Sequence, residues 1–168
     1  WAIGSLHSSV ESFQSIKNYI FSNFNDGDKL IFLGNIIGFR DNSKEIISEV
    51  LSLRFNLMSK FKLNHNDIVF LRGAQEEMFS KLLQLQIAPN PIEILDWLFS
   101  HGVDRTIISY GFNPDEFKNI ASQGAIQINK LTSKLNNEIS INSGHKEFFS
   151  SLKHAAYSES KEVLFVNR

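Results

Sequence analysis

A short apolar run that ends in a glycine and leads into a polar segment stands at residues 67–77, DIVFLRGAQEE. The run 68–71 is rich in β-branched and aromatic residues, which is typical of a buried strand. Gly73 supplies a turn, and Glu76 and Glu77 begin a segment with helical spacing, where carboxylates favour the positive end of the helix dipole. The stretch therefore predicts a strand that turns directly into a helix, which is where open α/β sheets place ligand sites.

The same strand-to-helix unit occurs twice earlier in the chain. Residues 1–4 end a first strand, and apolar residues then recur at helical spacing from Val10 to about residue 24. Residues 29–33 form a second apolar run, ended by Gly34, and a second helix follows Asn42. A third strand at 67–71 and a third helix from Glu76 complete the series. This alternation predicts a largely parallel sheet in an α/β fold.

The second half of the chain changes character after Ala88, where Pro89 and Pro91 interrupt the pattern. Helical signals follow one another at 92–100, 104–110, 115–122 and 126–135, which predicts a helical cap insertion spanning 88–140. A further helix at 145–152 precedes two short apolar runs, 155–158 and 163–166, that suit a hairpin or adjacent strands.

Composition limits the classes of protein to which the chain can belong. The length of 168 residues predicts one domain, 1–168, and 42% apolar residues indicate a packed core. A net charge of −1 without a basic block argues against nucleic acid as a partner. The absence of cysteine excludes disulfides and thiolate chemistry. No apolar stretch is long enough to predict a transmembrane segment, and a cytoplasmic location is the expectation.

The three strand ends have the order and spacing of a known family. They read GSLHS at 4–8, GNIIGFR at 34–40 and GAQE at 73–76. These loops resemble the calcineurin-like metallophosphoesterases, in particular the bacterial branch of the serine/threonine phosphoprotein phosphatases, whose loops read Asp-x-His-Gly, Gly-Asp-x-x-Asp-Arg-Gly and Gly-Asn-His-Glu. The sequence around the second loop, DKLIFLGNIIGFRDNSKEII at residues 28–47, also resembles the residue pattern of that family. The resemblance implies a sheet sandwich flanked by helices, with the helical cap inserted, of which this chain could be only part.

The residues that carry the family's chemistry are mostly replaced. The resemblance implies vestigial site positions at Ser5, His7, Asn35, Gly38, Ala74, Gln75, Glu76 and Asn167, with Phe39 where the family has its second-loop Arg. Only His7 and Glu76 are the expected residues. Family members hold two divalent metals, such as Mn, Fe or Zn, and a histidine at the position of Gln75 acts as general acid. The resemblance therefore predicts no catalytic residue, no bound metal and no cofactor in this chain.

Physical chemistry supports this expectation. Two divalent ions about 4 Å apart need carboxylates to offset their repulsion, whereas Ser5 and Asn35 are neutral. Ala74 cannot ligate a metal, and Gln75 has no proton that titrates. A lone imidazole such as His7 is a weak metal site. Arg40, one place beyond the family's arginine, is a possible anion contact, although a solvated loop arginine is the simpler interpretation.

Three hypotheses follow for function. The leading one is a catalytically inactive pseudo-phosphatase that serves as a binding, scaffold or assembly subunit, with a protein or a larger assembly as its partner. The alternative is an active metal-dependent phosphatase or phosphoesterase with an altered site built from His7, Asn35 and Glu76. A third hypothesis is that the chain is one piece of a split or longer enzyme. His101, His145 and Trp97 are interpreted as structural residues, although exposed aromatic residues on the cap would mark a partner surface.

Overall fold

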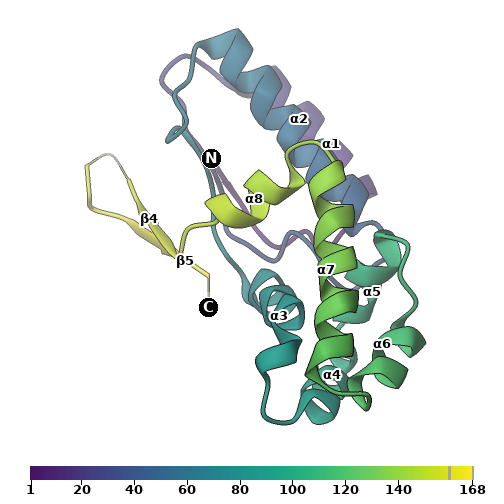
Figure 1. Cartoon of the computed structure of the whole chain (residues 1–168). Coiled ribbons are helices and arrows are strands. Elements are labelled where there is room, and N and C mark those ends of the chain that lie inside the picture. The colour runs from purple at the N-terminus through teal and green to yellow at the C-terminus, as the bar shows by residue number, and fades with distance from the viewer. Residues whose placement is uncertain (159, 168) are drawn as a thin grey trace.

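The computed structural model describes residues 1–158 and 160–167, which form a mixed α/β fold (Figure 1). Its elements in chain order are β1 (Ala2–Ile3), α1 (Val10–Asn23), β2 (Leu30–Phe32), α2 (Ser43–Phe61), β3 (Ile68–Phe70), α3 (Ala74–Leu83), the 3₁₀-helix η1 (Leu85–Ile87), α4 (Pro91–Ser100), α5 (Val103–Ser109), α6 (Pro114–Ala121), α7 (Ala125–Ile141), α8 (His145–Ser151), β4 (Ala155–Tyr157) and β5 (Leu164–Val166). The predicted strands and helices are all present, with shifted boundaries.

The first three strands form a parallel sheet with the order β1-β2-β3, as the alternation of strands and helices predicts. Leu30 pairs with Ile68 and Phe32 with Phe70, so equivalent residues of the two strands lie on the same face. All three loops that follow these strands therefore leave from one edge of the sheet, because the strands are parallel.

The two faces of this sheet have different neighbours. Phe32 packs against Phe13 of α1, with ring centroids 6.2 Å apart, so the face that carries Phe32 is covered by helices. Side chains alternate between faces along a strand, which puts Ile31 and Val69 on the opposite face. Ile31 and Val69 line a cavity of about 480 Å³ together with Phe165 of β5 and other residues of the β4–β5 hairpin.

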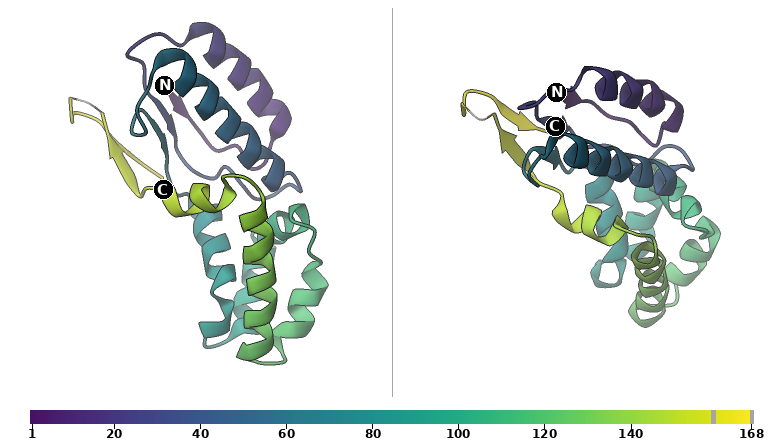
Figure 2. Two further views of the ribbon diagram at one scale, coloured as in Figure 1. Left: turned by 45° about the horizontal axis from the view of Figure 1, so that its top comes forward. Right: turned by 90° about the horizontal axis from the view of Figure 1, so that it is seen from above.

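A chain of aromatic rings connects the sheet to the helices beyond it. Adjacent rings lie 4.8 to 6.4 Å apart, centroid to centroid, in the order Phe32, Phe70, Phe148, Phe149, Phe79 and Tyr110. The buried apolar side chains of the sheet and of the helical segment belong to one connected cluster. The helices predicted between residues 88 and 140 are observed as α4–α7, and they pack against α2, α3 and α8 (Figure 2).

The β4–β5 hairpin confirms the predicted pairing of the last two apolar runs. Its strands are antiparallel, with Ala156 opposite Phe165, and it projects from the body of the molecule in all three views (Figures 1 and 2). A single parallel bridge between Leu71 and Lys153 joins the segment before the hairpin to the edge of the parallel sheet. None of the helices in the described residues has the length and apolar character needed to cross a membrane.

The third helix begins earlier than the sequence indicates. α3 starts at Ala74 instead of Glu76, with Gly73 as its N-cap. Ala74 and Gln75 therefore lie in the first helical turn and Glu76 occupies the third helical position, from which a side chain can reach back to the N-cap N–H. The position of Glu76 in this turn is central to the site described below.

A buried histidine joins α2, α5 and α8. The Nδ1 atom of His145 lies 2.7 Å from the Tyr110 hydroxyl, and its Nε2 atom lies 3.0 Å from Ser48 Oγ. Ser48 Oγ donates its own proton to the Lys44 carbonyl, so it can only accept from Nε2–H, and Nδ1 accepts from Tyr110. Burial, aided by the charge of Lys44, lowers the pKa of His145 below its ordinary value of 6.5.

This histidine predicts that stability falls under mildly acidic conditions. Below about pH 6.5 His145 binds a proton in the unfolded chain but stays neutral in the folded chain. The free energy of unfolding therefore decreases by up to about 1.4 kcal/mol per pH unit, until the pH falls to the pKa of His145 in the folded state. Urea denaturation at pH 8.0 to 5.5 should show this decrease in the native protein and a clearly smaller one in His145→Gln. The exposed His154 provides the control, since His154→Gln should keep the full decrease; equal decreases in all three proteins would contradict the assignment.

Candidate functional site

The three loops at the carboxyl edge of the parallel sheet lie against one another. In the first loop, the backbone N–H groups of Leu6 and His7 donate to the Asn35 carbonyl at 3.0 and 2.9 Å. The N–H of Ser8 donates to the Ile36 carbonyl at 2.8 Å. The first loop is therefore held on the backbone of the second, and these two loops lie together at the edge of the sheet.

Glu76 holds the second and third loops together. One carboxylate oxygen accepts from the N–H groups of Ile36, at 2.7 Å, and Ile37, at 3.1 Å. The other accepts from Asn35, at 2.9 Å, and from the N-cap Gly73, at 2.8 Å. Successive N–H groups that point into one concavity form an anion-binding nest. Here the anion is Glu76 itself, which is 1% exposed.

The two loops can approach this closely only because glycines face each other. A Cβ atom on Gly34 would lie 2.6 Å from the Gly73 nitrogen, and a Cβ on Gly73 would lie 2.2 Å from the Asn35 nitrogen. Gly34 also has a φ of +90°, which favours glycine. Any side chain at either glycine would separate the N–H groups that Glu76 binds together.

Asn35 joins all three loops through its side chain and backbone. Its φ of 53° is left-handed, a conformation that asparagine tolerates better than most residues. Its Oδ1 atom accepts from the Gln75 N–H at 3.0 Å, and its Nδ2 atom donates to Ser5 Oγ at 3.4 Å. The amide is thus engaged on both sides by neutral groups.

Gln75, at the position of the family's general acid, is buried. Its Nε2 atom donates to the His101 carbonyl at 2.9 Å, while its Oε1 atom has no hydrogen-bond partner in the described part of the chain. The side chain fills the space beside Gly38, where a Cβ would lie 2.1 Å from Gln75 Oε1. Gly38 has a φ of +93°. Gln75 therefore occupies the volume into which a side chain at position 38 would project.

His7 is held by an aromatic contact. Its ring meets Phe39 edge-on, with centroids 5.0 Å apart, and its Nδ1 atom is covered without a hydrogen-bond partner among the described residues. Phe39, at the position of the family's arginine, is 54% exposed. The imidazole is packed against a ring, and its Nδ1 atom is not open to solvent.

The remaining sequence-derived positions lie at the margin of this site. Ala74 is exposed at the start of α3. Asn167 Nδ2 donates to the Leu33 carbonyl at 2.6 Å, which brings this late residue to the end of β2. Arg40 lies apart, with Ser9 and Glu11, on a pocket of about 250 Å³.

The side chains gathered at the strand ends offer few metal ligands. No group of three or more His, Asp or Glu side chains is placed to hold a metal within residues 1–158 and 160–167. The one carboxylate at the centre, Glu76, already accepts four backbone hydrogen bonds. The remaining polar side chains are an imidazole, a hydroxyl and two amides.

Three buried hydroxyl side chains form a hydrogen-bonded chain that the sequence does not predict. Ser43 Oγ lies 2.8 Å from Ser8 Oγ and 3.0 Å from Thr106 Oγ1, and it accepts from the Gly38 N–H at 3.3 Å. These contacts join the first loop, the second loop and α5. Hydroxyl residues are common in loops and helix starts, so no pattern in the sequence singles these three out.

Exposed aromatic residues lie beside the three loops. Phe39 lies against Gly102, its N–H donating to the Gly102 carbonyl at 3.4 Å. The neighbouring His101 ring lies 4.4 Å from the ring of Trp97, centroid to centroid. Phe39 and Trp97 are both about half exposed. We call the row formed by His7, Phe39, His101 and Trp97 the aromatic rim.

Comparison with known proteins does not assign a family to the chain. No protein-family model matches the sequence, and no curated protein matches it either. The family resemblance rests on the residues of the three loops and on the sequence that flanks them.

The nest predicts a large effect for a minimal change at Glu76. Glu76→Gln replaces one oxygen by an NH₂ group that faces two N–H donors, which should lower the free energy of unfolding by about 3–5 kcal/mol. Glu77→Gln is the matched control, since Glu77 makes one partly buried ion pair, with Arg72 at 3.2 Å, and lies outside the nest. The control should cost less than about 1 kcal/mol. Guanidinium denaturation measures both; similar losses would contradict the role of Glu76.

A second prediction concerns the contact between Gly38 and Gln75. Gly38→Ala should cost about 2–5 kcal/mol, from the left-handed φ and the clash with Gln75. In a Gln75→Ala background the clash is gone, and the same change should cost only about 1–2 kcal/mol. Gly111, with a φ of +85° and nothing within 4 Å of its Cβ position, is the control for the φ cost alone. Equal costs of Gly38→Ala in the two backgrounds, measured by denaturation, would contradict the clash.

Proposed function

We propose that this protein is a metallophosphoesterase-like pseudo-phosphatase: a catalytically inactive domain that acts through binding, as a scaffold or assembly subunit. The fold of the resemblance, a sheet sandwich with a helical cap, is part of this proposal. Its support is the parallel sheet, the three converging loops and the β4–β5 hairpin, which faces the second side of the sheet across a cavity.

The observation that carries the proposal is that two neutral side chains, Ser5 and Asn35, lie beside the nest that Glu76 fills, where the resemblance implies metal-binding carboxylates. Four backbone N–H groups that could face an anionic ligand are turned inward to the Glu76 carboxylate. These hydrogen bonds fix the second loop against the start of α3. A site whose loops are held by a carboxylate of the protein itself is suited to a scaffold role, since these backbone hydrogen bonds need no bound ligand.

The side chains around Glu76 also lack the chemistry of hydrolysis. A two-metal mechanism needs ions that activate a water and stabilise the phosphoryl oxygens, and these ions need anionic ligands. Ser5 and Asn35 form a neutral pair at 3.4 Å, and Gln75 is bound to the His101 carbonyl. No proton donor of suitable pKa stands in the position of the general acid.

A protein partner is favoured by the aromatic rim. Aromatic residues are enriched at the centres of protein interfaces, and Phe39 and Trp97 each expose about half of their surface beside the site. The site thus presents apolar rings where the family resemblance implies charged ligands. We propose that the partner contacts this rim.

Metal content and turnover test the proposal. Purified protein incubated with Mn²⁺ and then desalted should retain far less than one metal ion per chain by elemental analysis. Turnover of an aryl phosphate with added Mn²⁺ should not exceed that of His7→Ala. Two tightly held ions per chain, or turnover that His7→Ala abolishes, would contradict the proposal and favour an active enzyme with an altered site.

A restored variant tests the family resemblance separately. Ser5→Asp, Asn35→Asp and Ala74→Asn together return the family's ligand types to their matching positions, and Gln75→His returns its general acid. If the loops keep the family's geometry, this variant should bind Mn²⁺ at least tenfold more tightly than the native protein, by calorimetry. A folded variant without any gain in Mn²⁺ affinity would count against the resemblance.

A further inference from the structure

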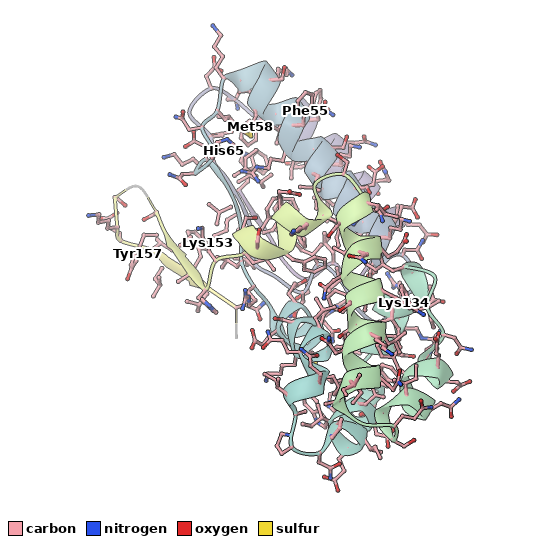
Figure 3. The ribbon with its side chains drawn as sticks, in the orientation of Figure 1. Phe55, Met58, His65, Lys134, Lys153 and Tyr157 are labelled. Atoms are coloured by element: carbon pink, nitrogen blue, oxygen red, sulfur yellow. The ribbon has the colours of Figure 1, made fainter. Side chains whose placement is uncertain are left out.

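A second polar pocket lies away from the loops, between α2, the loop before β3, the edge of β3 and the segment after α8. Its volume is about 210 Å³, and its polar lining includes Arg54, His65, Asn66 and Lys153. Figure 3 labels His65 and Lys153, which come from segments far apart in sequence. β3 is an edge strand here, bridged on its outer side only near Leu71 within the described residues.

Arg54 is the central cation of this pocket and is only partly solvated. Its guanidinium lies over the Phe70 ring, 5.6 Å from the centroid, and its Nε atom is covered with no hydrogen-bond partner among the described residues. Burial lowers the pKa of Arg54 from its ordinary value. Its Nη2 atom lies 3.0 Å from His65 Nδ1 and donates to the His65 carbonyl at 3.4 Å.

The lining of the pocket supplies donors and positive charge without a carboxylate. Arginine can only donate, so His65 Nδ1 accepts from Arg54, which places the proton of a neutral His65 on Nε2 as a donor. Lys153 adds a second cation, and it makes no side-chain ion pair within residues 1–158 and 160–167. A partly buried cation without an opposite charge is costly unless an anion accompanies it.

The carboxylate closest in sequence to His65 does not supply this charge. Asp67 does not line the pocket, and its two oxygens are engaged elsewhere. One lies 3.4 Å from Lys29 Nζ, and the other accepts from the Asn64 N–H at 2.7 Å. Within the described part of the chain, Arg54 likewise has no acidic partner within 4.0 Å.

We propose that this pocket binds a small oxyanion, either free inorganic phosphate or sulfate or the phosphate group of a larger metabolite. Arg54 and Lys153 supply the charge, and His65 and Asn66 supply neutral donors at the rim. Arginine suits such ligands because its planar group donates several parallel hydrogen bonds. The site is independent of the proposed function, since it shares no residue with the three loops.

Titration at constant ionic strength tests the proposal, because added salt alone would screen the surface charges. Inorganic phosphate, sulfate, glycerol phosphate and acetate are each added in place of chloride while backbone amide shifts are followed by NMR. We expect saturable shifts at residues 65–70 and 151–153 with phosphate, and a dissociation constant of about 1 mM or below. Tighter binding of glycerol phosphate than of phosphate would identify a phosphorylated metabolite as the source, and the reverse would identify the free ion.

Variants assign the binding to the pocket. Arg54→Gln should weaken phosphate binding at least tenfold, and Lys153→Gln should weaken it several-fold. Lys153 is exposed, so its variant keeps the test valid if Arg54→Gln does not fold. Two variants are the controls and should bind phosphate as the native protein does. They are Arg40→Gln, in the pocket that Arg40 lines with Ser9 and Glu11, and Lys134→Gln, on α7.

Three outcomes would overturn the proposal. They are the absence of saturable shifts at the pocket, phosphate affinity unchanged by Arg54→Gln or Lys153→Gln, and binding lost in Arg40→Gln instead. The last result would assign the anion to Arg40 and the pocket beside it. None of these results depends on metal content or turnover, so this proposal and the proposed function fail separately.

Discussion

The carboxylate of Glu76 is the interaction on which the arrangement of the three loops depends. It accepts hydrogen bonds from three consecutive N–H groups of the second loop and from the N-cap of α3. The first loop is attached in turn to the carbonyls of Asn35 and Ile36. Gly34 and Gly73 allow the close approach that lets one carboxylate reach both sides. Because buried N–H groups without partners are costly, removal of this carboxylate would affect all three loops together.

This arrangement separates the shape of the site from its ligands. The anion that satisfies the N–H groups at these strand ends is a side chain of the protein, Glu76, so these hydrogen bonds need no bound ligand. Ser5, Asn35 and Gln75 are then satisfied largely by one another and by backbone groups. Charge is unbalanced at the Arg54 pocket, where a partly buried cation has no carboxylate beside it among residues 1–158 and 160–167. The two regions therefore suggest different binding chemistries, apolar at the aromatic rim and anionic at the pocket.

Much of the fold could be predicted from periodicity. The apolar runs that end in Gly34 and before Gly73 predict parallel strands, and the observed register of β2 and β3 agrees with them. Turn glycines and parallel strands also predict that Ser5, Asn35 and Gln75 lie close together, and the hydrogen bonds of Asn35 to both residues agree. The predicted start of α3, at Glu76, was wrong by two residues. The helix begins at Ala74, because the Glu76 carboxylate accepts from the N–H of Gly73 and so caps the turn before it. The helix-dipole interpretation of Glu76 was incomplete for the same reason, since three of its four partners belong to another loop.

Local sequence determines the strands, the helices and the identities of the residues at the strand ends, because hydrophobic periodicity and turn chemistry act over a few neighbours. It also determines that these residues are neutral where a metal site needs carboxylates. Tertiary packing alone brings together groups that are distant in the chain: Glu76 with the second loop, Gln75 with Gly38, His145 with Tyr110, and Arg54 with Lys153. Burial changes the energy of these polar groups, and burial is a property of the packed core that no short stretch of sequence contains.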